Sequence, residues 1–174
     1  MLDATDRTGL NATRLLHVRS GPPAPPPGCT RRATSLAPLV HNRYQVAWDS
    51  ARVGPTYDVL APDGSEIRLL VQTHRASMVH CTLQPGQVSR AVRHQTVDEL
   101  WFCVSGRGQV WRKSAEIEET LDVERGVALN IPVGVSFQFR ASGAQPLEVV
   151  IVTIPPWPGA QEAMLVSGPW PVPT

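Results

Sequence analysis

The sequence predicts an all-β fold, either a sandwich or a barrel of short strands. Apolar and β-branched residues occur in short runs from Tyr57 onward. Turn-forming residues separate these runs, and no helix-like periodicity extends beyond two turns. Short strands at this spacing, with turns between them, are typical of all-β sandwiches and barrels.

Glycine and proline mark the predicted turns, because glycine tolerates a positive φ and proline presets the φ that a turn needs. The clearest turns lie at residues 61–64, 84–87, 106–108 and 132–134. Residues 41–56 fit either an edge strand or a loop. The predicted strands are residues 66–73, 77–83, 89–94, 99–105, 109–113, 127–131, 136–140 and 147–154.

The chain divides into a leader and a single domain. Residues 21–28 read Gly-Pro-Pro-Ala-Pro-Pro-Pro-Gly, and such a run forms neither a helix nor a strand ladder. We expect residues 1–40 to be a flexible, disordered leader, with a proline-rich ligand for an SH3-like partner as the alternative. The domain spans residues 41–174, with a core at about 57–156 and a tail rich in proline and tryptophan at 157–174.

The composition argues against several classes of function. The net charge is +1, with 16 basic and 15 acidic side chains, so the chain lacks the basic excess that favours nucleic acid or acidic membranes. No apolar stretch approaches the ~18 residues that span a bilayer, and no N-terminal apolar segment resembles a signal peptide. The three cysteines form no CxxC pair. We therefore expect a cytoplasmic protein with no nucleic-acid or membrane partner.

Two spaced motifs carry the strongest functional signal. In the first, Gly86 is followed by five residues, Val92, one residue, His94, four residues, Glu99, six residues and Gly106. This pattern resembles the first motif of the cupin family, in which a His stands at the position of Val92.

The second motif begins at Gly126 and continues through Pro132 and Gly134 to Phe137. It resembles the second cupin motif, in which a His stands where Phe137 stands here, and the closing Asn would fall on Ala141. The resemblance covers residues ~57 to ~154. It implies a double-stranded jelly-roll β-barrel with both motifs on strands around a central pocket.

The metal site that the resemblance implies is incomplete in this sequence. Cupins hold a metal with three His and one Glu, and here His94 and Glu99 alone remain. Val92 and Phe137 offer no lone pair, and first-row metals normally use three or more protein ligands. We expect no cofactor. A divalent transition metal is the alternative, held by His94 and Glu99 with Gln138 as a candidate third ligand.

Strand alternation sorts the candidate site residues by face, because successive side chains in a strand point to opposite sides. His94 and Glu99 are the candidate catalytic acid–base pair, with a structural hydrogen-bonded pair as the alternative. Arg90 is a candidate contact for a carboxylate or enolate oxygen, with a surface role as the alternative. The predicted ligand-binding residues are Arg90, Val92, Trp101, Phe137 and Phe139. His80 joins them if its strand faces inward.

Three functions fit these residues. The first is a cupin that binds a small organic molecule without a complete metal-ligand set. The second is a metal-independent isomerase, epimerase or cyclase that uses His94 and Glu99. The third is a metal-dependent dioxygenase or isomerase with non-standard ligands. We also expect a homodimer, because sheet edges need cover, with Trp157 and Trp170 packing outside the barrel or against a second subunit.

Overall fold

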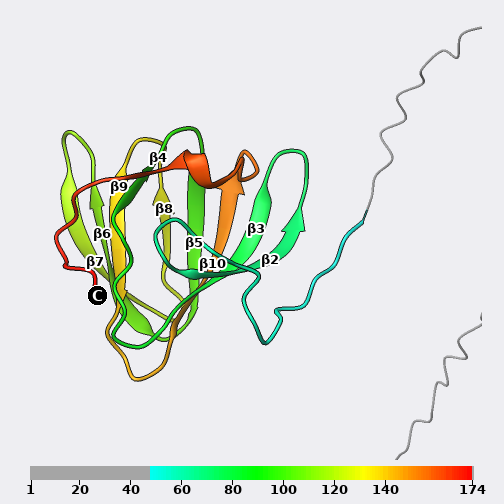
Figure 1. Cartoon of the computed structure of the whole chain (residues 1–174), viewed down its shortest axis with the longest axis horizontal. Coiled ribbons are helices and arrows are strands. Elements are labelled where there is room, and N and C mark those ends of the chain that lie inside the picture. Colours follow the sequence, from blue (N-terminus) through cyan, green and yellow to red (C-terminus); the bar gives the residue numbers. More distant parts are fainter. Residues whose placement is uncertain (1–47, 174) are drawn as a thin grey trace, which may run out of the picture. The chain divides into compact units, whose positions relative to one another are not determined.

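A computed structural model describes residues 48–173, which form two antiparallel β-sheets that face each other (Figure 1). The six-stranded sheet contains, in spatial order, β1 (Val59–Leu60), β2 (Glu66–Gln72), β3 (Ser77–Leu83), β10 (Leu147–Ile154), β5 (Asp98–Ser105) and β8 (Ala128–Ile131). The five-stranded sheet contains β11 (Ala163–Leu165), β4 (Val92–His94), β9 (Ser136–Ala141), β6 (Arg107–Lys113) and β7 (Glu118–Glu124). These sheets confirm the predicted all-β jelly roll.

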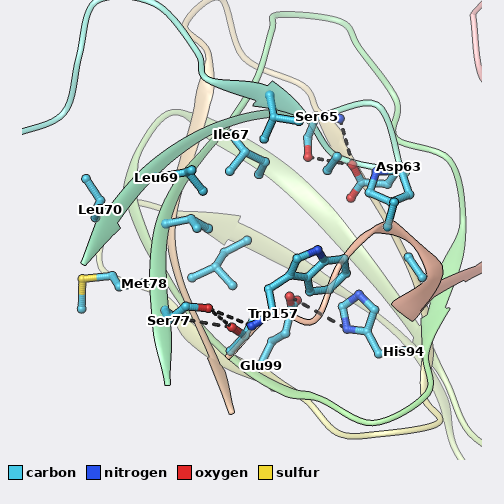
Figure 2. A pocket seen from close by; sticks show the side chains of 18 of the residues that line it. Asp63, Ser65, Ile67, Leu69, Leu70, Ser77, Met78, His94, Glu99 and Trp157 are labelled. Carbon is cyan, nitrogen blue, oxygen red and sulfur yellow. Dashed lines mark hydrogen bonds and ion pairs between the residues drawn. The ribbon is translucent and has the colours of Figure 1, made fainter. Parts of the chain in front are cut away.

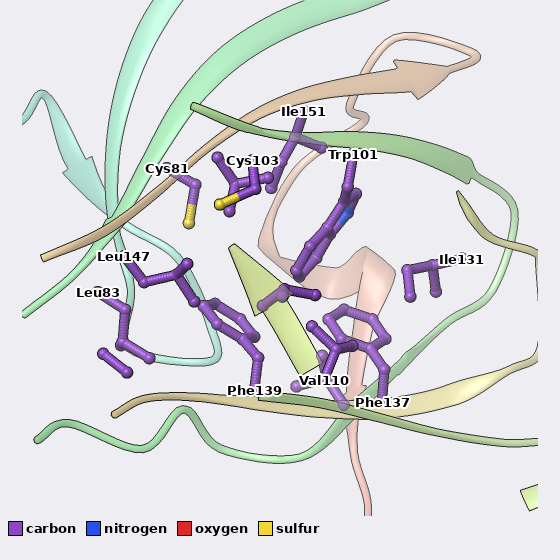
Figure 3. Packing of buried hydrophobic residues seen from close by; sticks show 14 residues of the cluster. Cys81, Leu83, Trp101, Cys103, Val110, Ile131, Phe137, Phe139, Leu147 and Ile151 are labelled. Carbon is purple, nitrogen blue, oxygen red and sulfur yellow. The ribbon is translucent and has the colours of Figure 1, made fainter. Parts of the chain in front are cut away.

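Alternation along the strands builds the hydrophobic core. In β5, Glu99, Trp101 and Cys103 are buried while Leu100 and Phe102 on the opposite face are exposed. The core cluster fills the space between the sheets (Figure 3), and its largest members are Trp101, Phe137, Phe139, Ile131 and Leu147. Burying such side chains contributes about 1.5–3 kcal/mol each, so this cluster is the main source of stability.

The turn between β5 and β6 explains one motif glycine. Gly106 has a φ of +79°, a left-handed conformation that favours glycine. A Cβ atom at this position would lie 2.1 Å from the backbone oxygen of Pro146. Gly106 is therefore required both for its conformation and for the close approach of the strand end to the neighbouring loop.

The strand β7 was not among the sequence predictions. Its sequence, Glu-Glu-Thr-Leu-Asp-Val-Glu, is mostly acidic, and only Leu121 and Val123 give a short apolar alternation, which is weak evidence for a strand. It pairs with β6 at the edge of the smaller sheet, where Lys113 binds Glu118 at 2.8 Å and Arg107 binds Glu124 at 3.3 Å. Cross-strand charge pairing thus adds to the burial of Leu121 and Val123 in this edge strand.

Two other predictions differ from the structure at the strand ends. The strand predicted for residues 89–94 contracts to β4, because the backbone N–H of Arg90 donates to Asp63 O instead of to a ladder partner. The proline-rich tail supplies a short edge strand, β11, which pairs with β4. Residues 48–56 carry no strand.

The end of the tail lies against the outer face of β9. Gln138 donates to Trp170 O at 2.8 Å and accepts from Trp170 N at 3.0 Å. The Arg140 guanidinium lies 4.4 Å from the centre of the Trp170 ring, a cation–π contact. Trp170 therefore packs outside the barrel as predicted, whereas Trp157 lies inside, as described below.

The predicted leader, residues 1–40, lies outside the described residues. Between residues 48 and 173, no helix is long and apolar enough to cross a membrane.

Candidate functional site

A cavity of about 750 Å³ occupies part of the space between the sheets. Figure 2 shows its lining, to which β1, β2 and β3 contribute mainly aliphatic side chains. Trp101, Phe137 and Trp157 add aromatic surface. A mainly apolar cavity of this size with a few polar groups is typical of a small-molecule site.

His94 and Glu99 both line this cavity (Figure 2). His94 is 3% exposed and Glu99 is 6% exposed. The distance from His94 Nδ1 to Glu99 Oε1 is 3.9 Å, too long for a hydrogen bond. Glu99 Oε2 accepts a hydrogen bond of 2.8 Å from the indole N–H of Trp101. The structure thus brings the predicted pair together inside the barrel.

Aromatic rings hold the His94 imidazole in place. Its ring centre lies 5.1 Å from that of Phe137 and 5.2 Å from that of Trp157, both in edge-to-face geometry. The Nδ1 atom is buried without a hydrogen-bond partner among the described residues. Packing, not hydrogen bonding, therefore fixes the orientation of this imidazole.

Burial shifts both pKa values away from the charged forms. Burial raises the pKa of Glu99 to about 8, opposed by the Trp101 hydrogen bond and reinforced by the charge of Asp63. Burial lowers the pKa of His94 to about 4, opposed by the charge of Glu162. At neutral pH the pair is therefore a carboxylic acid beside a neutral imidazole, not an ion pair.

Asp63 is a third polar group in the cavity, and the sequence analysis did not identify it as a site residue. It lies between β1 and β2, and its Oδ1 atom accepts from Ser65 N at 2.8 Å and from Ser65 Oγ at 2.7 Å. Burial raises the pKa of its carboxyl group, although the Ser65 hydrogen bonds and the charge of Arg90 oppose the shift. Only its position in a turn sequence marked Asp63 beforehand, and a turn does not reveal which way a side chain faces.

The remaining predicted site residues fall into two groups. Val92, Trp101 and Phe137 line the cavity. Phe139 does not line it and packs in the core at 1% exposure. Arg90 is exposed and donates to Pro62 O at 3.2 Å, because it precedes β4 and the alternation of that strand does not extend to it.

His80, the conditional candidate, also lies away from the cavity lining although it is buried. Its partner in β10 is Val150, and its strand neighbours Val79 and Cys81 belong to the core side of the sheet. The side chain of His80 therefore lies on the other face of β3.

The donor set around His94 does not fit a tightly held metal. No cluster of three or more His, Cys, Asp or Glu side chains that could hold a metal occurs in residues 48–173. Gln138, the candidate third ligand, points to the outer face, where its amide donates to Ser89 O at 2.9 Å and is bonded to Trp170. Val92 and Phe137 fill the positions of the missing ligands with hydrocarbon.

A segment of the tail closes one side of the cavity, and Glu162 anchors it. The buried Glu162 carboxylate accepts from the backbone N–H groups of Gln95 and Val97 at 2.9 Å each, and from Thr96. A further bond of 2.8 Å comes from the Thr96 hydroxyl. These residues follow His94 directly, so the anchor ties the segment that carries Trp157 to the strand that carries His94. The sequence analysis placed Trp157 outside the barrel and did not mark Glu162, because no motif marks the tail.

The comparisons with known proteins agree with this architecture. A family model described as the cupin domain matches residues 79–153, which include His94, Glu99 and Phe137. The matched residues, 79–153, therefore carry a cupin domain. No curated protein matched its sequence.

Solved structures share the fold at low sequence identity. A conserved protein with a double-stranded β-helix domain from Klebsiella pneumoniae gives a TM-score of 0.50 at 17% identity, covering 60% of this chain and 85% of that one. The coconut allergen cocosin gives 0.52 at 17%, covering 60% and 30%. Oxalate decarboxylase from Lactobacillus farciminis, in complex with formate, gives 0.51 at 22%, covering 59% and 31%. At these identities the similarity extends to the fold alone.

Proposed function

We propose that this cupin binds a bulky, mainly apolar small molecule in the cavity, without a complete metal-ligand set. The observation that carries the proposal is the cavity of about 750 Å³, lined by hydrocarbon and by the few polar groups of Asp63, His94 and Glu99. Ligand pockets are typically about 300–1,000 Å³ and mostly apolar, with a small number of polar groups that fix orientation.

The similarity to oxalate decarboxylase does not suggest a small acid as the ligand. That similarity is limited to the fold. Oxalate carries negative charge, whereas Asp63 and Glu99 place carboxyl groups on the cavity wall. An ionised Asp63 would repel such an anion, and the neutral Glu99 supplies no positive charge to attract it.

Binding of the neutral dye Nile red tests the proposal. Its fluorescence should rise on mixing with the protein, because the dye leaves water for an apolar cavity. Ile67→Trp fills part of the cavity and should abolish the rise, since Ile67 lines the wall. Ile117→Trp is the matched control at an exposed turn. No rise with the unmodified protein, or a rise that survives Ile67→Trp, would refute the proposal.

A metal-independent isomerase, epimerase or cyclase is the second candidate function. It is favoured by one observation: Glu99 and His94 lie 3.9 Å apart, and burial keeps Glu99 protonated and His94 unprotonated. Pairs of groups with pKa values pushed apart are typical of acid–base sites. Under this proposal, Glu99→Gln removes turnover and leaves affinity for the ligand within about twofold. If the unmodified protein shows no turnover and Glu99→Gln weakens ligand binding, the result would support a binding function alone.

A further inference from the structure

The ionisable side chains that line the cavity include carboxyl groups and no Lys or Arg of the described residues. These carboxyl groups belong to Asp49, Asp63 and Glu99. Asp63 is half-buried, and a carboxylate on a mainly apolar wall usually has a partner, because removing an unpaired charge from water is costly. Within residues 48–173, the nearest cation acting on Asp63 is Arg90, which does not line the cavity.

Asp63 shows the imbalance most clearly. Ser65 satisfies its Oδ1 atom through two hydrogen bonds, and Oδ2 has no hydrogen-bond partner within residues 48–173. The nearby Arg90 is exposed, and its guanidinium donates to Pro62 O without forming an ion pair with Asp63 within 4.0 Å. One carboxyl oxygen of Asp63 is therefore free for a donor that comes from outside the described chain.

A second, independent observation also points to a ligand. The His94 imidazole lines the same cavity, is 3% exposed, and makes no hydrogen bond to any described residue. Buried polar side chains are nearly always hydrogen-bonded, so an unpartnered one in a cavity marks a place where a ligand can bind. Figure 2 shows Asp63 and the His94–Glu99 pair on different parts of the wall of one cavity.

We propose that the cavity selects an apolar amine, whose protonated nitrogen pairs with the free carboxyl oxygen of Asp63. This inference rests on the proposed function, since it names the class of molecule that the cavity takes. An ammonium group offers donors only, which suits a wall whose carboxyl oxygens are acceptors. Its positive charge also favours the ionised form of Asp63 and supplies the missing counter-charge.

The aromatic part of the wall suits the same ligand. Trp101, Phe137 and Trp157 present ring surface to the cavity. Aromatic faces attract cations and also bury hydrocarbon, so an apolar amine gains from both properties. A carboxylate of the same shape gains only the second and meets Asp63 as a like charge.

Three probes of one shape test the inference: 1-adamantanamine, 1-adamantanol and 1-adamantanecarboxylate, titrated at pH 7 by ligand-observed NMR. We expect the amine to bind about tenfold or more tightly than the alcohol, and the carboxylate to bind most weakly, since one desolvated charge pair contributes more than 1.4 kcal/mol. Asp63→Asn keeps the size of the side chain and should bring the amine and alcohol affinities within about twofold. Asp122→Asn, on β7 away from the cavity, removes the same charge and should leave the tenfold preference intact.

The outcomes separate this inference from the proposed function. If the alcohol binds the unmodified protein and Ile67→Trp abolishes that binding, the proposed function is supported, whatever the affinity for the amine. Equal affinities for the amine and the alcohol, or an amine preference that survives Asp63→Asn, would overturn the inference alone. A preference removed by Glu99→Gln but not by Asp63→Asn would also overturn it, by assigning the charge pairing to Glu99. If Asp63→Asn does not fold, equal affinities on the unmodified protein, or an amine preference that Glu99→Gln removes, would still overturn the inference.

Discussion

The interior of this jelly roll has two regions that differ in packing, although the same strands build both. Around Phe139, Val110 and Leu147 the sheets meet in a continuous hydrophobic core (Figure 3). Around His94 and Glu99 they are separated by a cavity of about 750 Å³. The contrast shows that the fold itself requires only the first region. The second leaves polar groups buried at a cost in stability, as sites of function commonly do.

Two phenylalanines on β9 give the strongest test of this comparison. Phe139→Ala should lower the free energy of unfolding by about 3–5 kcal/mol, because the residue is surrounded by core side chains. Phe137→Ala should cost less, because its ring lines the cavity, so its removal enlarges a space that already exists. Urea unfolding of both variants measures the difference. Equal losses would show that the cavity region is packed as tightly as the core.

The Glu162 anchor tests whether the cavity wall has its own stabilising contacts. Glu162→Gln should cost about 2 kcal/mol, because hydrogen bonds to a charged acceptor contribute about 1.5–3 kcal/mol and the amide replaces only part of them. Glu116→Gln, on an exposed turn, is the control. Glu162→Gln should also weaken ligand binding, since the anchored segment carries Trp157 into the cavity wall. Unchanged thermal unfolding would contradict this role.

The same anchor predicts a pH dependence at the acidic end. Burial alone raises the pKa of Glu162, but the hydrogen bonds from Thr96, Val97 and Gln95 outweigh it and lower the pKa overall. A carboxyl group with a lowered pKa stabilises the fold above its ordinary pKa, and this contribution disappears as the pH falls below it. The loss of stability below pH 4.5, the ordinary value, should therefore be shallower in Glu162→Gln.

The cavity pair predicts an opposite trend near neutral pH. Glu99 has a raised pKa of about 8, so the folded state holds a proton that the unfolded chain has released above pH 4.5. Stability should therefore fall with rising pH until pH 8. His94, lowered from 6.5 to about 4, offsets this fall below pH 6.5. Between pH 6.5 and pH 8 the Glu99 effect remains alone, and about 2 kcal/mol of stability should be lost.

Glu99→Gln isolates that effect. The amide cannot ionise, so the fall in stability between pH 6.5 and pH 8 should disappear from denaturant unfolding curves. Glu119→Gln, on an exposed edge strand, should retain the fall. If the free energy of unfolding falls equally in Glu99→Gln, another group titrates in this range. The predicted protonated state of Glu99 would then be wrong.

The sequence predicted features that follow from local patterns, such as strands and turns. It did not predict features that depend on contacts between distant segments. Alternation and turn signals predicted most strands, and motif spacing placed His94 beside Glu99 across β4 and β5. Period-two reasoning placed Arg90 on the His94 face, but it failed there because the strand begins only at Val92. Alternation correctly separated Gln138 from the Phe137 face.

Three residues of the cavity region could not be predicted for a common physical reason. Asp63 lies in a turn, and Trp157 and Glu162 lie in a proline-rich tail, so neither strand nor helix periodicity fixes the direction of their side chains. Each reaches the cavity region through a contact with a distant segment: Glu162 binds residues 95–97, and Trp157 packs on His94. The core, by contrast, is specified by alternation alone.

The smallest expected effect concerns metal, and it tests whether the polar groups of the cavity region serve a ligand or an ion. Removal of metals with EDTA should shift the melting temperature by less than about 1 °C, because we expect no bound ion that stabilises the folded state. Elemental analysis of untreated protein should find far less than one equivalent of zinc, iron, manganese or nickel. The reason is that His94 and Glu99 are two donors facing hydrocarbon at Val92 and Phe137. One equivalent that disappears in His94→Ala would contradict this expectation. It would require a third ligand from outside the described residues or a rearranged Gln138, and the cavity region would then be a metal centre.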